Sequence, residues 1–140
     1  KIYMITFTIV TPQGVLYKDS IDKVTIPTQA GAITVYPEHI PVVSALRAGE
    51  LNIHKGNDVV NLAISTGVVE IRPNSIVYVL ADTAERSNEI DVDRAELAKK
   101  RAEELFAKEE KMLDIDFARL QAKIEKEIVR SSVGRKYRNV

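Results

Sequence analysis

Apolar and polar positions alternate with the period of a β-strand through the first 84 residues. In residues 3–10, Ile5, Phe7 and Ile9 share one face while Thr6 and Thr8 lie on the other, which is the pattern of a half-buried strand. Short runs rich in Val and Ile follow at residues 23–26, 32–36, 42–46, 51–54, 59–65, 68–72 and 76–80. About eight short strands with no helical stretch between them predict an all-β sandwich or flattened barrel.

The pattern changes to a helical one after residue 84. Every proline, and every glycine except Gly134, lies before residue 74, so that residues 74–133 contain neither. From Asp91 or Asp93, either of which can cap a helix, the apolar residues recur at helical spacing at Ala95, Ala98, Ala102, Leu105 and Phe106. We expect this helix to end near Lys111.

A second helix is predicted from Asp114 or Asp116. Its apolar stripe consists of Phe117, Leu120, Ile124 and Ile128. A short loop near Leu113 would make the two helices antiparallel. The sequence therefore predicts a β-sandwich domain at residues 1–84, followed by an antiparallel α-helical hairpin at residues 85–140.

Composition narrows the possible functions. The chain has 140 residues and zero net charge, so no general attraction to nucleic acid or to an anionic membrane is expected. It contains no cysteine, which excludes disulfides and thiolate chemistry. The apolar runs are too short to span a bilayer, and we expect a soluble cytoplasmic protein. We also expect no catalysis, because no Gly-rich phosphate loop and no metal-ligand spacing is found.

Charged residues concentrate in the predicted hairpin, with 27 among the last 56 residues against 13 among the first 84. On the second helix, Arg119, Lys123, Lys126 and Arg130 stack along one face. An antiparallel hairpin would bring Arg94 and Arg101 of the first helix toward Lys126 and Arg130. These cations, with little acid among them, would suit an anion of several charges. The alternative is an ordinary solvated surface in which Glu125 and Glu127 compensate the basic residues.

A short motif lies at the start of the first helix. It consists of Ile90, Asp91, Arg94 and Ala95, with Glu85 upstream. A carboxylate at Asp91 can accept hydrogen bonds from a ribose hydroxyl, an adenine amino group or Arg94 itself. The small Ala95 would leave room for a flat ring. The pattern fits a nucleotide better than a bare phosphate.

Three longer stretches are typical of one family. They are residues 31–49 around Tyr36-Pro37-Glu38-His39-Ile40-Pro41, residues 64–71 and residues 80–86. Together with Thr11-Pro12 and Gly14, they resemble the epsilon subunit of the rotary proton-translocating ATP synthase, which is called delta in mitochondria. The resemblance covers essentially the entire chain. It implies an N-terminal β-sandwich and a C-terminal helical hairpin.

The resemblance implies a non-catalytic regulatory subunit on the cytoplasmic face of the bacterial plasma membrane, peripheral and without membrane insertion. Its sandwich would bind the gamma stalk and the ring of c subunits. Its hairpin would inhibit ATP hydrolysis by extending into the catalytic hexamer of alpha and beta subunits. There the basic face formed by Arg119, Lys123, Lys126 and Arg130 would meet acidic segments of the beta subunits.

Members resembling those of thermophilic bacilli bind ATP through an Ile-Asp-x-x-Arg-Ala motif. That resemblance implies ATP as a regulatory ligand, with Mg²⁺ left open, and no metal site of the protein itself. The matching residues here are Glu85, Ile90, Asp91, Arg94, Ala95, Arg101 and Arg130. Lys126 departs from the pattern, because such members carry an arginine there, and it lacks the bidentate fork that binds phosphate oxygens. The alternative is a purely structural assembly adaptor of the rotor that binds no nucleotide.

Overall fold

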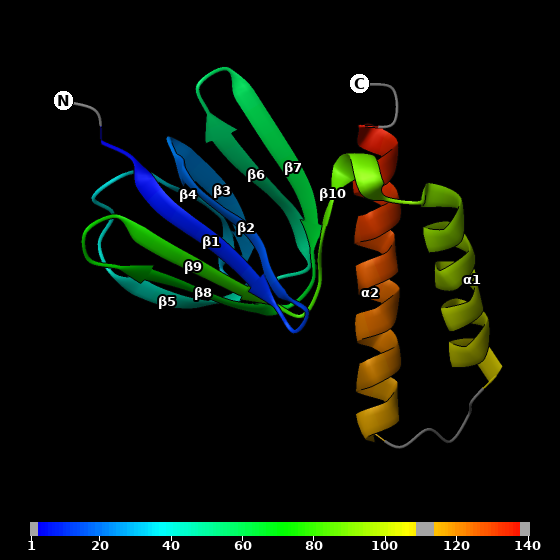
Figure 1. The fold of residues 1–140 in the computed structure, drawn as a ribbon. Coiled ribbons are helices and arrows are strands. Elements are labelled where there is room, and N and C mark those ends of the chain that lie inside the picture. The colour runs from blue at the N-terminus through cyan, green and yellow to red at the C-terminus, as the bar shows by residue number, and fades with distance from the viewer. Residues whose placement is uncertain (1–2, 109–113, 138–140) are drawn as a thin grey trace. The chain divides into compact units, whose positions relative to one another are not determined.

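The structure is a computed structural model that describes residues 3–108 and 114–137. It divides into two compact units, with the division between Arg86 and Ser87. The first unit consists of strands and the second of helices (Figure 1). Each unit is described by itself.

The first unit is a β-sandwich in the form of a single, nearly closed sheet. Its strands are β1 (Ile5–Thr11), β2 (Gly14–Ile21), β3 (Lys23–Thr28), β4 (Gly31–Val35), β5 (Val42–Leu46), β6 (Gly49–Lys55), β7 (Asp58–Ile64), β8 (Gly67–Arg72), β9 (Ile76–Ala81) and β10 (Ala84–Arg86). Their order is β10-β7-β6-β3-β5-β8-β9-β1-β2, with β4 paired to β3. Neighbouring strands are antiparallel except for β1 and β9, which run parallel.

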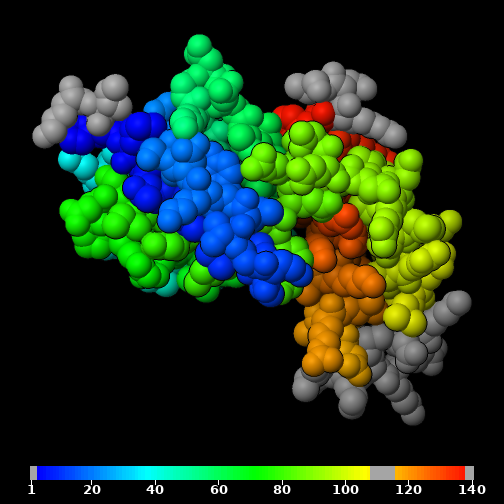
Figure 2. Space-filling model, in the orientation of Figure 1, coloured from blue at the N-terminus to red at the C-terminus, as the bar shows by residue number. Residues whose placement is uncertain are grey.

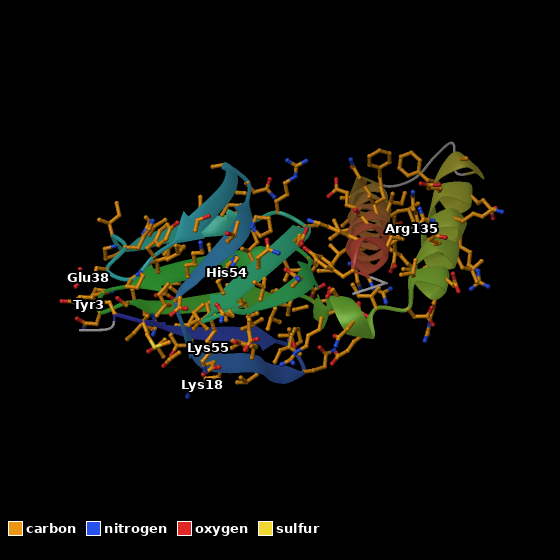
Figure 3. The ribbon with its side chains drawn as sticks, turned by 90° about the horizontal axis from the view of Figure 1, so that it is seen from above. Tyr3, Lys18, Glu38, His54, Lys55 and Arg135 are labelled. Atoms are coloured by element: carbon orange, nitrogen blue, oxygen red, sulfur yellow. The ribbon has the colours of Figure 1, made fainter. Side chains whose placement is uncertain are left out.

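The predicted all-β class is confirmed, and two strands are added to those expected. The sequence pattern missed β2, because Lys18, Asp19 and Ser20 interrupt its apolar positions. It also missed β10, which is only three residues long. The far end of β2 approaches β6: the Asp22 amide donates to the His54 carbonyl at 2.9 Å, and Lys55 Nζ lies 2.7 Å from Asp19 Oδ2. Figure 3 labels His54 and Lys55 in this region.

A core of large apolar side chains fills the sandwich. Its members include Ile5, Phe7 and Ile9 of β1, which the alternating pattern placed on one face, and each of them is completely buried. The remaining buried aliphatic residues come from β2, β3 and β4 and from β5 through β9. One face of nearly every strand therefore contributes to a single core, which fixes the register of the sheet.

The second unit is an antiparallel helical hairpin. A short 3₁₀ helix, η1 (Ser87–Glu89), precedes α1 (Val92–Lys108) and α2 (Asp114–Lys136), and the two α-helices lie side by side (Figure 1). The predicted hairpin is confirmed, and α2 begins at Asp114, the first of the two expected starts. The predicted end of the first helix at Lys111 and the loop near Leu113 lie outside the described residues.

Only part of the predicted apolar stripe is buried. Ala95, Ala102 and Leu120 are buried, whereas Leu105, Phe106, Phe117 and Ile128 are exposed. The rings of Phe106 and Phe117 nevertheless contact one another, with centroids 4.8 Å apart. Within residues 3–108 and 114–137, no helix is long and apolar enough to cross a membrane.

Candidate functional site

The predicted nucleotide motif lies at the N-terminus of α1. Asp91 immediately precedes the helix, and its Oδ1 accepts a hydrogen bond from the Arg94 backbone amide at 3.0 Å. The Asp91 carbonyl accepts from the Ala95 amide at 2.9 Å. Asp91 is thus the N-cap, the first of the two expected caps. One oxygen of its carboxylate satisfies a free amide of the helix, and a carboxylate has further acceptor capacity for a ligand.

A polar cavity of about 270 Å³ opens beside this cap. Its walls are Ser87, Asn88 and the segment from Ile90 to Asp93 on one side, and Gly134 and Tyr137 at the end of α2 on the other. The cavity therefore brings Ile90 and Asp91 of the motif together with the end of the second helix. Its volume falls just below the range of about 300–1,000 Å³ that is usual for small-molecule sites.

Gly134 lets the segment before α1 approach α2 closely. A Cβ atom placed on Gly134 would lie 2.6 Å from Cγ2 of Val92 and 3.0 Å from Cγ2 of Ile90. A side chain at position 134 would thus press on both neighbours of Asp91 in the motif. Sequence reasoning did not single out this residue, although it is the only glycine after position 67.

Ala95 is completely buried. It therefore offers no surface to a flat ring in this conformation, and its small size serves the packing of α1. Any contribution of Ala95 to nucleotide binding would be indirect, through the position of the first turn of the helix.

Two contacts set the register of the hairpin in which the cations lie. Arg135 of α2, labelled in Figure 3, forms an ion pair with Glu96 of α1, and Phe106 contacts Phe117 nearer the other end. Arg101 lies between these two contacts on α1, and Lys126 and Arg130 lie between them on α2. Arg94 lies two residues before Glu96, beyond this central stretch. The hairpin thus places Arg101 at the level of Lys126 and leaves Arg94 nearer the end of α2.

Acid does lie among the predicted cations. Glu127 is buried, and its Oε2 accepts a hydrogen bond from Nη1 of Arg130 at 2.8 Å. The expectation of little acid in this region is therefore wrong at Arg130, and the alternative in which Glu127 compensates the basic stripe applies there. A carboxylate so close to Arg130 weakens the attraction of that guanidinium for a phosphate.

The remaining basic residues are more accessible. Arg94 and Arg101 are exposed on α1, and Arg119 and Lys123 are exposed on α2. Lys126 is half-buried. The four residues of the predicted inhibitory face thus differ in their exposure to solvent. Arg119 and Lys123 are exposed, Lys126 is half-buried, and Arg130 is hydrogen-bonded to Glu127.

Glu85 belongs to the other compact unit. It lies in β10, where it pairs with Ala63 of β7, and it is half-buried. The other predicted nucleotide contacts, from Ile90 to Arg130, all belong to the helical unit. Among residues 3–108 and 114–137, no group of three or more His, Cys, Asp or Glu side chains is arranged to hold a metal ion.

Two family models match consecutive parts of the chain. The model of the ATP synthase delta/epsilon chain β-sandwich domain matches residues 4–87, and that of the delta/epsilon chain long α-helix domain matches residues 88–133. Among curated proteins, the ATP synthase epsilon chain of Desulforamulus reducens is 42% identical over 87% of this chain and 90% of its own length. The epsilon chain of Bacillus licheniformis is 37% identical over 91% of this chain and 95% of its own length.

A solved structure has the same fold. A chain in the Euglena gracilis mitochondrial ATP synthase, in a structure of OSCP, F1 and the c-ring, superposes with a TM-score of 0.77 at 20% identity. The match covers 94% of this chain and 81% of that chain.

Proposed function

The chain belongs to the ATP synthase delta/epsilon family as an epsilon chain of the central stalk, and we propose that its helical hairpin binds ATP when compact and inhibits ATP hydrolysis when extended. The observation that carries the proposal is the position of the Ile90–Asp91 motif. The motif caps α1 and, together with the end of α2, forms the walls of a polar cavity. It begins four residues after Arg86, the last residue of the first unit. A ligand bound there joins both helices.

ATP would occupy the cavity only in part. Its ribose or base would lie beside Asp91, where the carboxylate accepts hydrogen bonds. The phosphates would extend along the surface toward Arg94 and Arg101, which are exposed, and toward Lys126. Arg130 would contribute less than the other cations because Glu127 already binds it.

Such a ligand would act by a population shift. ATP bridges α1 and α2 only while they are antiparallel neighbours, so it stabilises the compact hairpin and opposes extension. The size of the shift equals the difference in ATP affinity between the two states. Depletion of ATP would release the hairpin, and its exposed Arg119 and Lys123 would meet acidic segments of the beta subunits.

Calorimetry on the purified chain tests nucleotide binding. We expect ATP to bind the parent, and Arg94→Ala to weaken binding by about tenfold or more, as loss of a charge-assisted hydrogen bond does. Arg119→Ala is the matched control, since it removes an exposed arginine of α2 that is not among the proposed ATP contacts. Titrations with Mg²⁺ and with a chelator show whether the metal accompanies ATP. Equal binding by the parent and Arg94→Ala would refute the site, and no binding by the parent would favour the adaptor alternative.

Truncation tests inhibition in the assembled enzyme. The cut belongs after Arg86, because β10 is part of the sheet and covers the edge of β7. We expect the truncated chain to assemble and ATP hydrolysis to rise. An unchanged rate of hydrolysis would count against an inhibitory hairpin.

The sandwich would provide the contacts with the gamma stalk and the c-ring. Its outer surface carries exposed apolar residues on neighbouring strands: Val43 of β5, Val68 of β8 and Leu80 of β9. Val68 and Leu80 are register partners, so they form one patch. Leu80→Asp should lower incorporation of the chain into the stalk, whereas Val15→Asp, an exposed position on β2, should not. Equal incorporation of both variants would argue against this patch.

A further inference from the structure

We infer that Tyr137, an aromatic residue in the wall of the cavity beside the Asp91 cap, determines specificity at the proposed nucleotide site by stacking on the base. The inference rests on the proposed function, in which ATP binds the compact hairpin. It concerns a residue beyond the match to the long α-helix domain, which ends at residue 133. All the residues that carry it belong to the helical unit.

The charge of the cavity suits a base better than a phosphate. Two of the residues that line it are acids, Asp91 and Asp93, and none of its described lining residues is a lysine or an arginine. Carboxylates repel a phosphate, but they accept hydrogen bonds from the exocyclic amino group of a purine. The base of ATP therefore lies in the cavity, and the phosphates lie outside it, toward the exposed Arg94 and Arg101.

The aromatic residue separates the base from the ribose. Both groups can donate hydrogen bonds to Asp91, so the cap alone does not choose between them. A base is flat and stacks on an aromatic ring, a contact that contributes substantially to nucleotide affinity in other proteins, whereas a ribose is not flat. Tyr137 is half-buried, so part of its surface remains accessible. The base rather than the ribose is thus the group that gains most from this cavity.

Tyr137 is held in place although it follows the last residue of α2. Its amide donates to the Val133 carbonyl at 3.3 Å, which continues the helical turn, and Val133 is buried. Nζ of Lys136 lies 5.2 Å from the centroid of the Tyr137 ring, within the range of a cation–π interaction. A side chain held by such contacts loses less conformational freedom when a base stacks on it.

The packing of the hairpin keeps Tyr137 near the cap. Gly134 has no side chain, and a Cβ atom placed there would lie only 3.0 Å from Cγ2 of Ile90 and 2.6 Å from Cγ2 of Val92. The end of α2 also lies against η1, as the red and light-green segments of Figure 2 show. The compact hairpin therefore assembles the two walls of the cavity, and a base bound between them opposes separation of the helices.

Calorimetry on the full chain with two anions tests the inference. The probes are ATP and inorganic tripolyphosphate, which carries the phosphates without a base. In Tyr137→Leu we expect the affinity for ATP to fall by about five- to tenfold, as loss of one base–aromatic contact implies, and the affinity for tripolyphosphate to stay unchanged. Tyr137→Phe keeps the ring and should bind ATP like the parent. Arg94→Ala should weaken the binding of both anions.

NMR spectroscopy gives a second measurement that needs no affinity for tripolyphosphate. A base stacked on a ring shifts the resonances of the ring protons. We expect the Tyr137 ring resonances, which Tyr137→Phe identifies, to shift on saturation with ATP and to stay in place on addition of tripolyphosphate.

Phe106→Leu is the matched control. It removes another aromatic ring of the hairpin, one that contacts Phe117 and does not line the cavity, so ATP affinity should not change. Equal ATP affinity in Tyr137→Leu and the parent, equal losses for ATP and tripolyphosphate, or unshifted Tyr137 resonances at saturating ATP would each overturn the inference and leave ATP binding itself intact. A parent chain that binds no ATP would refute the proposed function and the inference with it.

Discussion

The sandwich and the hairpin bury very different side chains. Among the described residues of the sandwich, fifteen valine, leucine, isoleucine and phenylalanine side chains, including Phe7, have less than 2% of their surface exposed. Among the hairpin residues that the structure describes, the most completely buried apolar one is Ala95, and the two phenylalanines that contact one another remain 37% and 44% exposed. Full burial of a large apolar side chain contributes about 1.5–3 kcal/mol, so the sandwich gains far more from its own packing.

This difference indicates how the two units divide their work. A unit that buries large side chains from nearly every strand has one stable arrangement, because any other would expose its core. A helix pair with few buried apolar residues and half-exposed aromatic rings loses less when its helices separate. The packing is therefore consistent with the proposed roles, which are a fixed attachment for the sandwich and a change of partner for the hairpin.

The largest effect should come from removing a core aromatic ring. Phe7→Ala is expected to cost about 3–5 kcal/mol, whereas Phe106→Ala should cost only about 0.5–1.5 kcal/mol because its ring pair is partly exposed. Urea unfolding measures both. Tyrosine fluorescence reports chiefly on the sandwich, which holds four of the five tyrosines, and circular dichroism reports on the helices. Similar losses of unfolding free energy in the two variants would show that the two units do not differ in how much their packing stabilises them.

A second contrast compares two closely packed glycines. A Cβ atom on Gly67 would collide with the backbone carbonyl of Leu80, which no rotamer change relieves, so Gly67→Ala should cost about 3 kcal/mol. At Gly134 the obstacles are the side chains of Val92 and Ile90, and alanine gains about 1 kcal/mol of helix propensity. Gly134→Ala should therefore change hairpin stability by about 1 kcal/mol or less. Thermal unfolding of the two variants measures both changes in stability. A larger loss of stability in Gly134→Ala than in Gly67→Ala would contradict this account.

A third change acts on the hairpin alone. Asp91→Ala removes the N-cap of α1 and should destabilise the hairpin by about 1 kcal/mol, leaving sandwich stability unchanged. Asp91→Asn is the control, because asparagine caps equally well. Hydrogen exchange at the Arg94 amide, which Asp91 binds, measures the effect. Equal exchange in Asp91→Ala and the parent would show that the cap contributes nothing.

The smallest effect is a pH dependence confined to the sandwich. The hydrogen bond from Lys55 holds the pKa of Asp19 below its usual range, so this pair stabilises the fold above the unfolded-state pKa of about 3.9. The contribution is lost as pH falls through the lowered pKa. The difference in unfolding free energy between the parent and Asp19→Asn should be constant near neutral pH and vanish once the pH lies below the lowered pKa of Asp19. A difference that persisted in acid would exclude the ion pair as its source.

Sequence reasoning succeeded where one residue type and its spacing decide the structure. The alternation in β1, the glycine- and proline-free stretch and the Asp91 cap each depend on near neighbours in the chain, and the fold class followed from them. The sequence pattern did not predict the strands β2 and β10. Both are strands because they pair with neighbouring strands, and their own residues carry little strand signal. Asp19 and Lys18 of β2 carry little strand signal, and β10 becomes a strand only by pairing with β7.

The candidate site shows the same limit. Spacing alone placed Arg130 and Lys126 on one helical face, but the burial of Glu127 and its bond to Arg130 depend on how side chains pack around α2. The same is true of Gly134, whose place against Ile90 and Val92 is a property of two segments that lie 42 or more residues apart in the sequence.

The sequence by itself determined the two kinds of unit, the cap that starts α1 and the chemistry of the motif, because periodicity and capping act over a few residues. Only the tertiary structure decided which strands close the sheet and which cations remain available to a ligand. It also decided that Tyr137, just after α2, lines the same cavity as Asp91. Those outcomes depend on contacts between residues distant in the chain, whose burial and charge are set only when the chain has folded.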